Sequence, residues 1–83
     1  MRYRAKIEVS LKPGTTDPEG NTTRSLLKEL GYNVSEVGVS KVYTIRLEAT
    51  SVGEAKAKSE EIAKRLLANP TKDDFTMIVE EQR

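Results

Sequence analysis

Neither cysteine nor histidine occurs among the 83 residues of the sequence. The absence of cysteine excludes disulfides, thiolate nucleophiles and thiolate-bound zinc or iron–sulfur centres. The absence of histidine removes the commonest general base and the commonest metal ligand of proteins. The groups left for chemistry are carboxylates, lysines, arginines, tyrosines and hydroxyls. They predict a chain without catalytic apparatus of its own.

Long apolar runs and an excess of one charge are also missing. No apolar run approaches the ~20 residues that cross a bilayer, and the amino-terminal segment lacks the apolar core of a signal peptide. The 14 basic and 13 acidic residues are interleaved along the chain, for a net charge of +1. A nucleic-acid binder normally gathers a basic excess on one face. We therefore expect a cytoplasmic protein that binds neither nucleic acid nor a membrane.

The length predicts a single domain over residues 1–83. A domain of this size buries only about 60–65% of the surface that its unfolded chain exposes, so its core is thin. Small domains of this kind often gain stability by associating.

Strict alternation marks a first strand. Apolar side chains occupy every second position from Tyr3 to Leu11, with charged or polar residues between them, so a half-buried strand is predicted over residues 3–11. Pro13 and Gly14 end this strand, because proline cannot donate to a strand ladder and glycine opens turn conformations.

A first helix is predicted over residues 18–30. Asp17 is a preferred N-cap, and Pro18 suits the first helical position. Gly31 is a natural left-handed stop. The apolar stripe of this helix consists of leucines: Leu26, Leu27 and Leu30.

Residues 34–50 alternate again, but they are too many for one typical strand. We predict two antiparallel strands that turn near Ser40 and Lys41. A single bent strand with a bulge near Gly38 is the alternative.

The remaining segment predicts a helix and a strand. Ser51 and Glu54 form a capping box that starts the helix, and Pro70 follows its end at Asn69. A last strand is predicted over residues 75–81, where apolar side chains alternate again.

The predicted order is therefore βαββαβ. It indicates an α+β fold, a two-layer sandwich of the ferredoxin-like kind, with a four-stranded antiparallel sheet and both helices on one face. Val42 and Ile78 would point to the open face, which predicts that part of that face is covered by self-association.

No constellation of polar residues points to chemistry. The paired carboxylates diverge on a helix or alternate between strand faces, so they do not converge on an ion. The carboxylate pairs are Glu60 with Glu61, Asp73 with Asp74, and Glu80 with Glu81.

The outward positions of the strands also carry no aromatic platform for RNA bases.

Several short motifs resemble a known family. They are VSLKPG at residues 9–14, DPEG at 17–20, LGY at 30–32, VGVSK at 37–41, AKRLLANP at 63–70 and VEE at 79–81. Together they resemble PurS, the small subunit of formylglycinamide ribonucleotide amidotransferase, also called phosphoribosylformylglycinamidine synthase. The likeness covers essentially the whole chain. Ser40 departs from it, because glycine is expected there in much of the family.

The resemblance implies a subunit of an ATP-dependent glutamine amidotransferase that acts in purine biosynthesis. Such a subunit is a dimer or tetramer that bridges a large synthetase subunit and a glutaminase subunit and aids ammonia transfer between them. It carries no catalytic residue and binds no cofactor or metal, while ATP and Mg are used by the synthetase subunit. The likeness falls on exposed loops at four positions that we expect to contact partners: Lys12, Asp17, Pro18 and Lys41. Pro13, Gly14, Gly20 and Gly31 are expected to shape turns.

Two alternatives remain open at the level of sequence. One is a regulatory domain of the same fold that binds a small ligand at a dimer interface. The other is an acylphosphatase-like enzyme, which needs an arginine in the loop after the first strand. That loop, residues 12–16, contains a lysine and no arginine.

Overall fold

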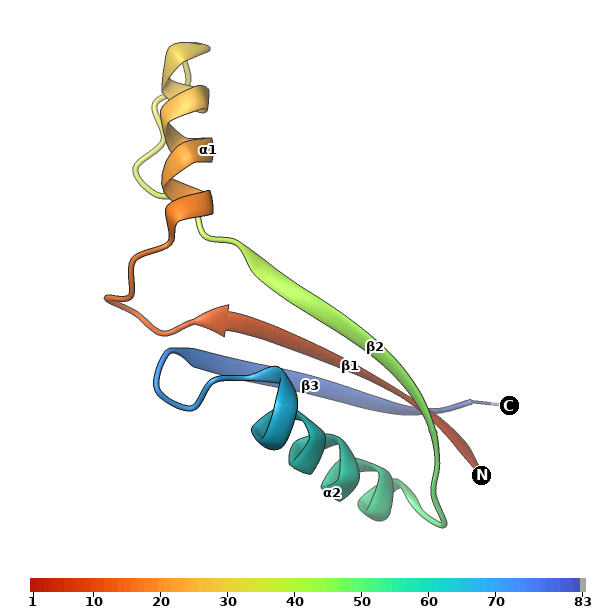
Figure 1. Cartoon of the computed structure of the whole chain (residues 1–83). Coiled ribbons are helices and arrows are strands. Elements are labelled where there is room, and N and C mark those ends of the chain that lie inside the picture. The colour runs from red at the N-terminus through yellow and green to blue at the C-terminus, as the bar shows by residue number, and fades with distance from the viewer. Residues whose placement is uncertain (83) are drawn as a thin grey trace.

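A computed structural model describes residues 1–82. Its sheet has three antiparallel strands in the order β2-β1-β3. The central strand β1 (Arg2–Leu11) lies between β2 (Ser40–Glu48) and β3 (Asp73–Gln82) (Figure 1). The alternation in β1 has the consequence expected from the sequence, since its odd-numbered side chains form the core: Tyr3, Ala5, Ile7 and Val9.

Helix α2 (Val52–Ile62) and the π-helical turn η1 (Ala63–Leu67) cover one face of this sheet. The residues that face the sheet at i, i+4 and i+8 are small and fully buried, which lets the helix lie close to the strands. They are Ala55, Ser59 and Ala63. The buried Ser59 hydroxyl donates to the carbonyl oxygen of Ala55 at 2.7 Å, so its polarity is satisfied within the helix.

The predicted start of α2 is confirmed. The Ser51 hydroxyl oxygen accepts from the Glu54 backbone N–H at 3.1 Å. The Glu54 carboxylate reaches back to the Thr50 hydroxyl at 2.6 Å rather than to Ser51 itself. Glu54 therefore fixes the chain just before the helix as well as its first turn.

Helix α1 (Pro18–Glu29) packs on neither face of the sheet. It projects from the end of β1, and the chain returns alongside it before β2 begins (Figure 1). We call residues 15–39 the arm, and the sheet with α2 and η1 the body. The molecule measures 51 × 29 × 14 Å, with a radius of gyration of 16.4 Å. A compact chain of this length would have a radius of about 12 Å.

The predicted four-stranded sandwich is wrong in two respects. The return segment, residues 33–39, forms no strand, so β2 is one strand from Ser40 and neither the hairpin nor the strand bulged near Gly38 is present. Helix α1 does not share the face that α2 covers. The missing strand and the displaced helix have one cause. The return segment packs on α1 instead of pairing with a strand. The α+β class, the antiparallel sheet and the two helices are confirmed.

The two ends of the described chain, residues 1 and 82, lie together at the end of the body remote from the arm (Figure 1). Arg2 on β1 pairs with Gln82 on β3.

Candidate partner-contact site

The base of the arm contains two hollows. The first, about 410 Å³, is lined by the end of β1, the following loop and the return segment, and it includes Lys12 and Asp17. The second, about 260 Å³, includes Asp17 and Lys41. The structure thus gathers three of the four predicted contact residues around adjoining hollows. Pro18 lines neither and lies exposed at the first turn of α1.

Asp17 holds the base of the arm together. Its Oδ1 accepts from the Gly20 N–H at 2.9 Å, as expected of an N-cap, and its Oδ2 accepts from the Val39 N–H at 3.0 Å. The hydrogen bond from Gly20, followed by that from Val39, lowers the pKa of Asp17 below its ordinary value against the opposing effect of desolvation. One carboxylate therefore joins the start of α1 to the end of the return segment.

Gly20 lies inside α1 rather than in a turn, which corrects the role expected for it. It is buried, and a Cβ built on it would come 2.1 Å from the carbonyl oxygen of Val37. Only glycine admits such an approach of the return segment to the helix. Gly14 and Gly31, by contrast, have φ angles of 84° and 95°, values that L side chains rarely adopt.

Lys12 and Lys41 differ in their surroundings. The Nζ of Lys12 lies 3.1 Å from Asp74 at the start of β3, and its backbone N–H donates to the carbonyl oxygen of Lys72 at 2.7 Å. Lys41 is exposed at the start of β2, and it forms no ion pair within residues 1–82. Lys41 is consequently the more available cation at the base of the arm.

Sequence reasoning missed the link between Asp17 and Val39, which are 22 positions apart. The N-cap signal at Asp17 was visible, but it accounts for only one of the two carboxylate oxygens. The close contact of Gly20 with Val37 was also missed. The one available signal was a glycine in the first turn of a helix, where it lowers stability unless something approaches closely.

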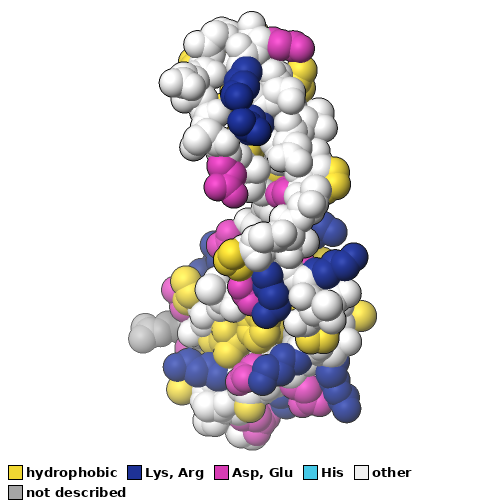
Figure 2. Space-filling model, turned by 90° about the vertical axis from the view of Figure 1, so that its left-hand side faces the viewer, with side chains coloured by type: hydrophobic (Ala, Val, Ile, Leu, Met, Phe, Trp, Pro, Cys, Tyr) yellow, Lys and Arg dark blue, Asp and Glu magenta, His cyan; other side chains and the backbone are white. Residues whose placement is uncertain are grey.

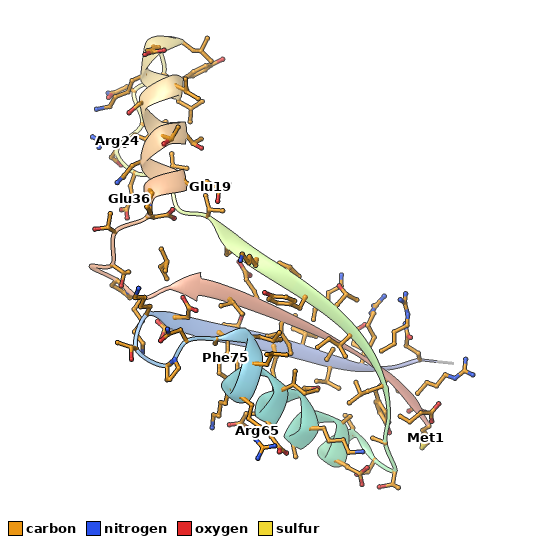
Figure 3. All side chains as sticks on the ribbon, in the orientation of Figure 1. Met1, Glu19, Arg24, Glu36, Arg65 and Phe75 are labelled. Atoms are coloured by element: carbon orange, nitrogen blue, oxygen red, sulfur yellow. The ribbon has the colours of Figure 1, made fainter. Side chains whose placement is uncertain are left out.

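No group of three or more acidic side chains that could hold a metal ion occurs among residues 1–82. Figure 3 shows the charged side chains of Glu19, Arg24 and Glu36 on the arm, well apart from Phe75, which packs against the core of the body. None of the helices described is long and apolar enough to cross a membrane.

The fold and site define a class of protein: a small α+β domain with a three-stranded antiparallel sheet, one packed helix and one protruding helix. The chain belongs to the PurS family, whose model, described as phosphoribosylformylglycinamidine (FGAM) synthase, matches residues 4–81. The resemblance inferred from the sequence motifs is therefore confirmed.

Individual relatives agree with the family match. The subunit PurS of phosphoribosylformylglycinamidine synthase from Methanocaldococcus jannaschii is 39% identical over 79 residues, covering 94% of this chain and 95% of the relative. The solved structure of Thermus thermophilus PurS is 36% identical, with a TM-score of 0.88 and complete coverage of both chains. A chain in the structure of PurLQS from Thermotoga maritima, 22% identical with a TM-score of 0.86, shares the fold; it covers 96% of this chain and 99% of that one.

Proposed function

We propose that this chain is a non-catalytic subunit of phosphoribosylformylglycinamidine synthase in purine biosynthesis. It bridges the ATP-dependent synthetase subunit and the glutaminase subunit and aids ammonia transfer from one to the other. The observation that carries this proposal is the family match over residues 4–81. The solved M. jannaschii relative is described as one of the subunits of formylglycinamide ribonucleotide amidotransferase in the purine biosynthetic pathway.

The shape of the chain supports a bridging role. A body and a protruding arm offer separate surfaces to separate partners, which a compact domain of this size does less well. In this proposal Lys12, Asp17, Pro18 and Lys41 contact a partner at the base of the arm. Because both oxygens of Asp17 already accept from backbone N–H groups, its part is to shape the surface, and Lys41 supplies the charge.

The proposal assigns ATP and Mg to the synthetase subunit and no cofactor to this chain. It also includes self-association, as a dimer or tetramer. In this proposal the other two subunits carry out the chemistry, and this chain holds them in position relative to each other.

Reconstitution tests the proposal. Synthetase and glutaminase subunits are assayed with and without this chain, once with glutamine and once with ammonium as the nitrogen source. Omission of the chain is expected to lower glutamine-dependent turnover at least tenfold and to leave ammonium-dependent turnover nearly unchanged, because free ammonia needs no bridge. Unchanged glutamine-dependent turnover without the chain would contradict the proposal.

A further inference from the structure

The face of the sheet opposite α2 carries no helix within residues 1–82 (Figure 1). It presents the even-numbered side chains of the three strands, and we call it the open face. Three strands about 4.8 Å apart and nine or ten residues long give this face an area of about 400 Å². One partner contributes roughly 800 Å² to a standard specific interface, so the affinity of so small a contact depends strongly on its charges.

Three cations lie together in the middle of the open face. Arg4 and Lys6 come from β1, and Arg46 comes from β2. The register places Arg4 directly opposite Arg46, and Lys6 follows two positions along β1, opposite Thr44. Side chains in such neighbouring positions are about 5–8 Å apart. We call Arg4, Lys6 and Arg46 the basic centre.

The described chain does not neutralise the basic centre. The Nη2 of Arg4 lies 2.8 Å from the Oε2 of Glu80 on β3, and this contact balances one of the three charges. Lys6 and Arg46 are exposed, and neither forms an ion pair within residues 1–82. Two positive charges therefore remain in the middle of the face.

This arrangement lowers the stability of the isolated chain. Like charges directly opposite each other on neighbouring strands destabilise a sheet, and Arg4 and Arg46 are such a pair. Two positions along, Arg2 has Glu48 opposite it instead, and the two form an ion pair. Figure 2 shows basic and acidic side chains interleaved around the end of the body beneath the arm. A departure from this local rule is expected where a surface serves a function.

Apolar side chains flank the basic centre. Ile78 on β3 lies directly opposite Lys6 and is 62% exposed, and Val42 on β2 is 60% exposed. The stems of lysine and arginine side chains add further apolar surface. A surface complementary to the open face therefore combines carboxylates with apolar side chains.

Two other occupants fit the open face less well. A second copy of the chain, related by a twofold axis through the basic centre, would place cation against cation. A single-stranded nucleic acid would find no aromatic side chain for its bases to stack on, because the even-numbered positions of the three described strands hold none. The charges and the apolar flank together fit an acidic protein surface best.

We propose that the open face docks an acidic surface of one of the two partner subunits. Carboxylates of that subunit lie on Lys6 and Arg46, and its apolar side chains lie on Ile78 and Val42. Arg46 is five residues, or about 17 Å, along β2 from Lys41, whose side chain belongs to the opposite face. The basic centre and the base of the arm are thus separate surfaces for separate partners. This inference rests on the proposed function and assigns a second contact surface to it.

Carbodiimide cross-linking tests which groups contact the basic centre. The reagent joins a lysine amine to a carboxylate in direct contact with it, and mass spectrometry maps the joined residues. In the complex of this chain with the synthetase and glutaminase subunits, Lys6 is expected to join carboxylates of one partner subunit. Arg46→Lys supplies a second amine, which is expected to join the same partner surface. Lys56, exposed on α2, is the control and is expected to give less than about a tenth of the yield.

Charge reversal tests the contribution of the basic centre to binding. Lys6→Glu combined with Arg46→Glu is expected to raise the dissociation constant for that partner at least about 30-fold, because it sets like charges against each other. The matched control, Lys56→Glu combined with Lys72→Glu, changes the net charge equally and is expected to change the constant less than about threefold. Isothermal titration calorimetry at about 50 and 300 mM salt should show that salt weakens binding of the unaltered chain and not that of the first variant.

Stability separates binding from folding. Arg46→Glu alone is expected to raise the Tm of the isolated chain, because a carboxylate opposite Arg4 replaces a repulsive pair by an attractive one. The same variant is expected to bind the partner at least about fivefold more weakly. A residue that served only the fold would not gain stability and lose binding in one substitution.

The outcomes distinguish this inference from the proposed function. Unchanged glutamine-dependent turnover without the chain contradicts the proposed function, and this inference with it. A working complex whose affinity is indifferent to charge reversal at Lys6 and Arg46 overturns docking on the open face alone. Cross-links from Lys6 to a second copy of the chain also overturn it. So does a single-stranded RNA oligonucleotide that binds more tightly than either subunit and loses its affinity on charge reversal.

Discussion

In the body, the odd-numbered residues of β1 from Tyr3 to Val9 are buried, whereas in the arm Leu26 of α1 and Leu30 at its end face solvent. The body is stabilised in the ordinary way, by apolar side chains removed from water. The arm gains little from burial, and its conformation depends on a few backbone contacts, chiefly those of Asp17 and Gly20. The difference teaches that one short chain can combine a region held by a buried apolar core with a region whose shape depends on a few hydrogen bonds and one close backbone contact.

The largest expected effect comes from the centre of the body. Ile7→Ala removes a fully buried side chain and is expected to lower the free energy of unfolding by about 2–5 kcal/mol. The matched control, Ile78→Ala, alters a side chain that is 62% exposed and should change it by less than about 1 kcal/mol. Urea unfolding is measured at one fixed protein concentration, because association adds to stability. An equal loss of unfolding free energy in the two variants would show that burial around β1 does not stabilise the body.

Gly20→Ala affects the arm. The added Cβ would meet the carbonyl oxygen of Val37, so the return segment must move, at a cost of about 1–3 kcal/mol. Amide hydrogen exchange in residues 20–39 is expected to quicken about 5- to 150-fold, with the amides of the strands little changed. Gly53→Ala is the control, because the nearest atom to its Cβ, the Ser51 hydroxyl oxygen, is 3.8 Å away. Alanine there should leave the arm unaffected and favour α2 slightly.

The pH dependence of the arm follows from Asp17. Its pKa is lowered in the folded chain, so the stabilisation is fully present above the ordinary value of 3.8 and is lost as the pH falls through the folded pKa. Protection of the Gly20 and Val39 amides is therefore expected to decline below pH 3.8, as followed by NMR. In Asp17→Asn the decline should be absent and protection should be low at every pH. An unchanged decline in that variant would assign it to another group.

The smallest effect is expected for an exposed ion pair. Lys12→Ala removes the contact with Asp74, and because both side chains are about half exposed, the loss should be below about 1 kcal/mol. The same substitution is expected to weaken binding of a partner subunit if the base of the arm is a contact surface. Thermal unfolding and a binding assay on one preparation separate the two results. A large loss of stability without a change in partner binding would show that Lys12 stabilises the fold and does not contact the partner.

The regular parts of the fold were predictable because their signals are local. Alternation placed β1 and β3 within two residues of their observed ends, and Asp17 and Ser51 marked both helix starts. The arm was not predictable in this way. The leucine stripe of the first helix is the same whether it faces its own sheet or solvent, and the alternation of Val37 and Val39 is the same in a strand and in a return segment. What decides between them is the contact of these residues with Gly20 and Asp17, which lie far away in the sequence.

The candidate site followed the same division. The sequence motifs indicated the loops at the base of the arm. There Lys12, Asp17 and Lys41 lie around neighbouring hollows. The way in which Asp17 uses both its oxygens depends on the folded path of the chain, so residue type alone does not reveal it. Partner contact at these positions stays a prediction for the experiments above.

Both ends of the described chain lie at the extremity of the body opposite the arm, where Arg2 pairs with Gln82. A tether or a fluorescent protein fused to either end is thereby kept away from α1 and from the hollows at its base. Chains anchored to a sensor surface in this way would all present the arm outward. The arrangement makes the protein well suited to immobilised binding measurements, in which attachment does not mask the surface under test.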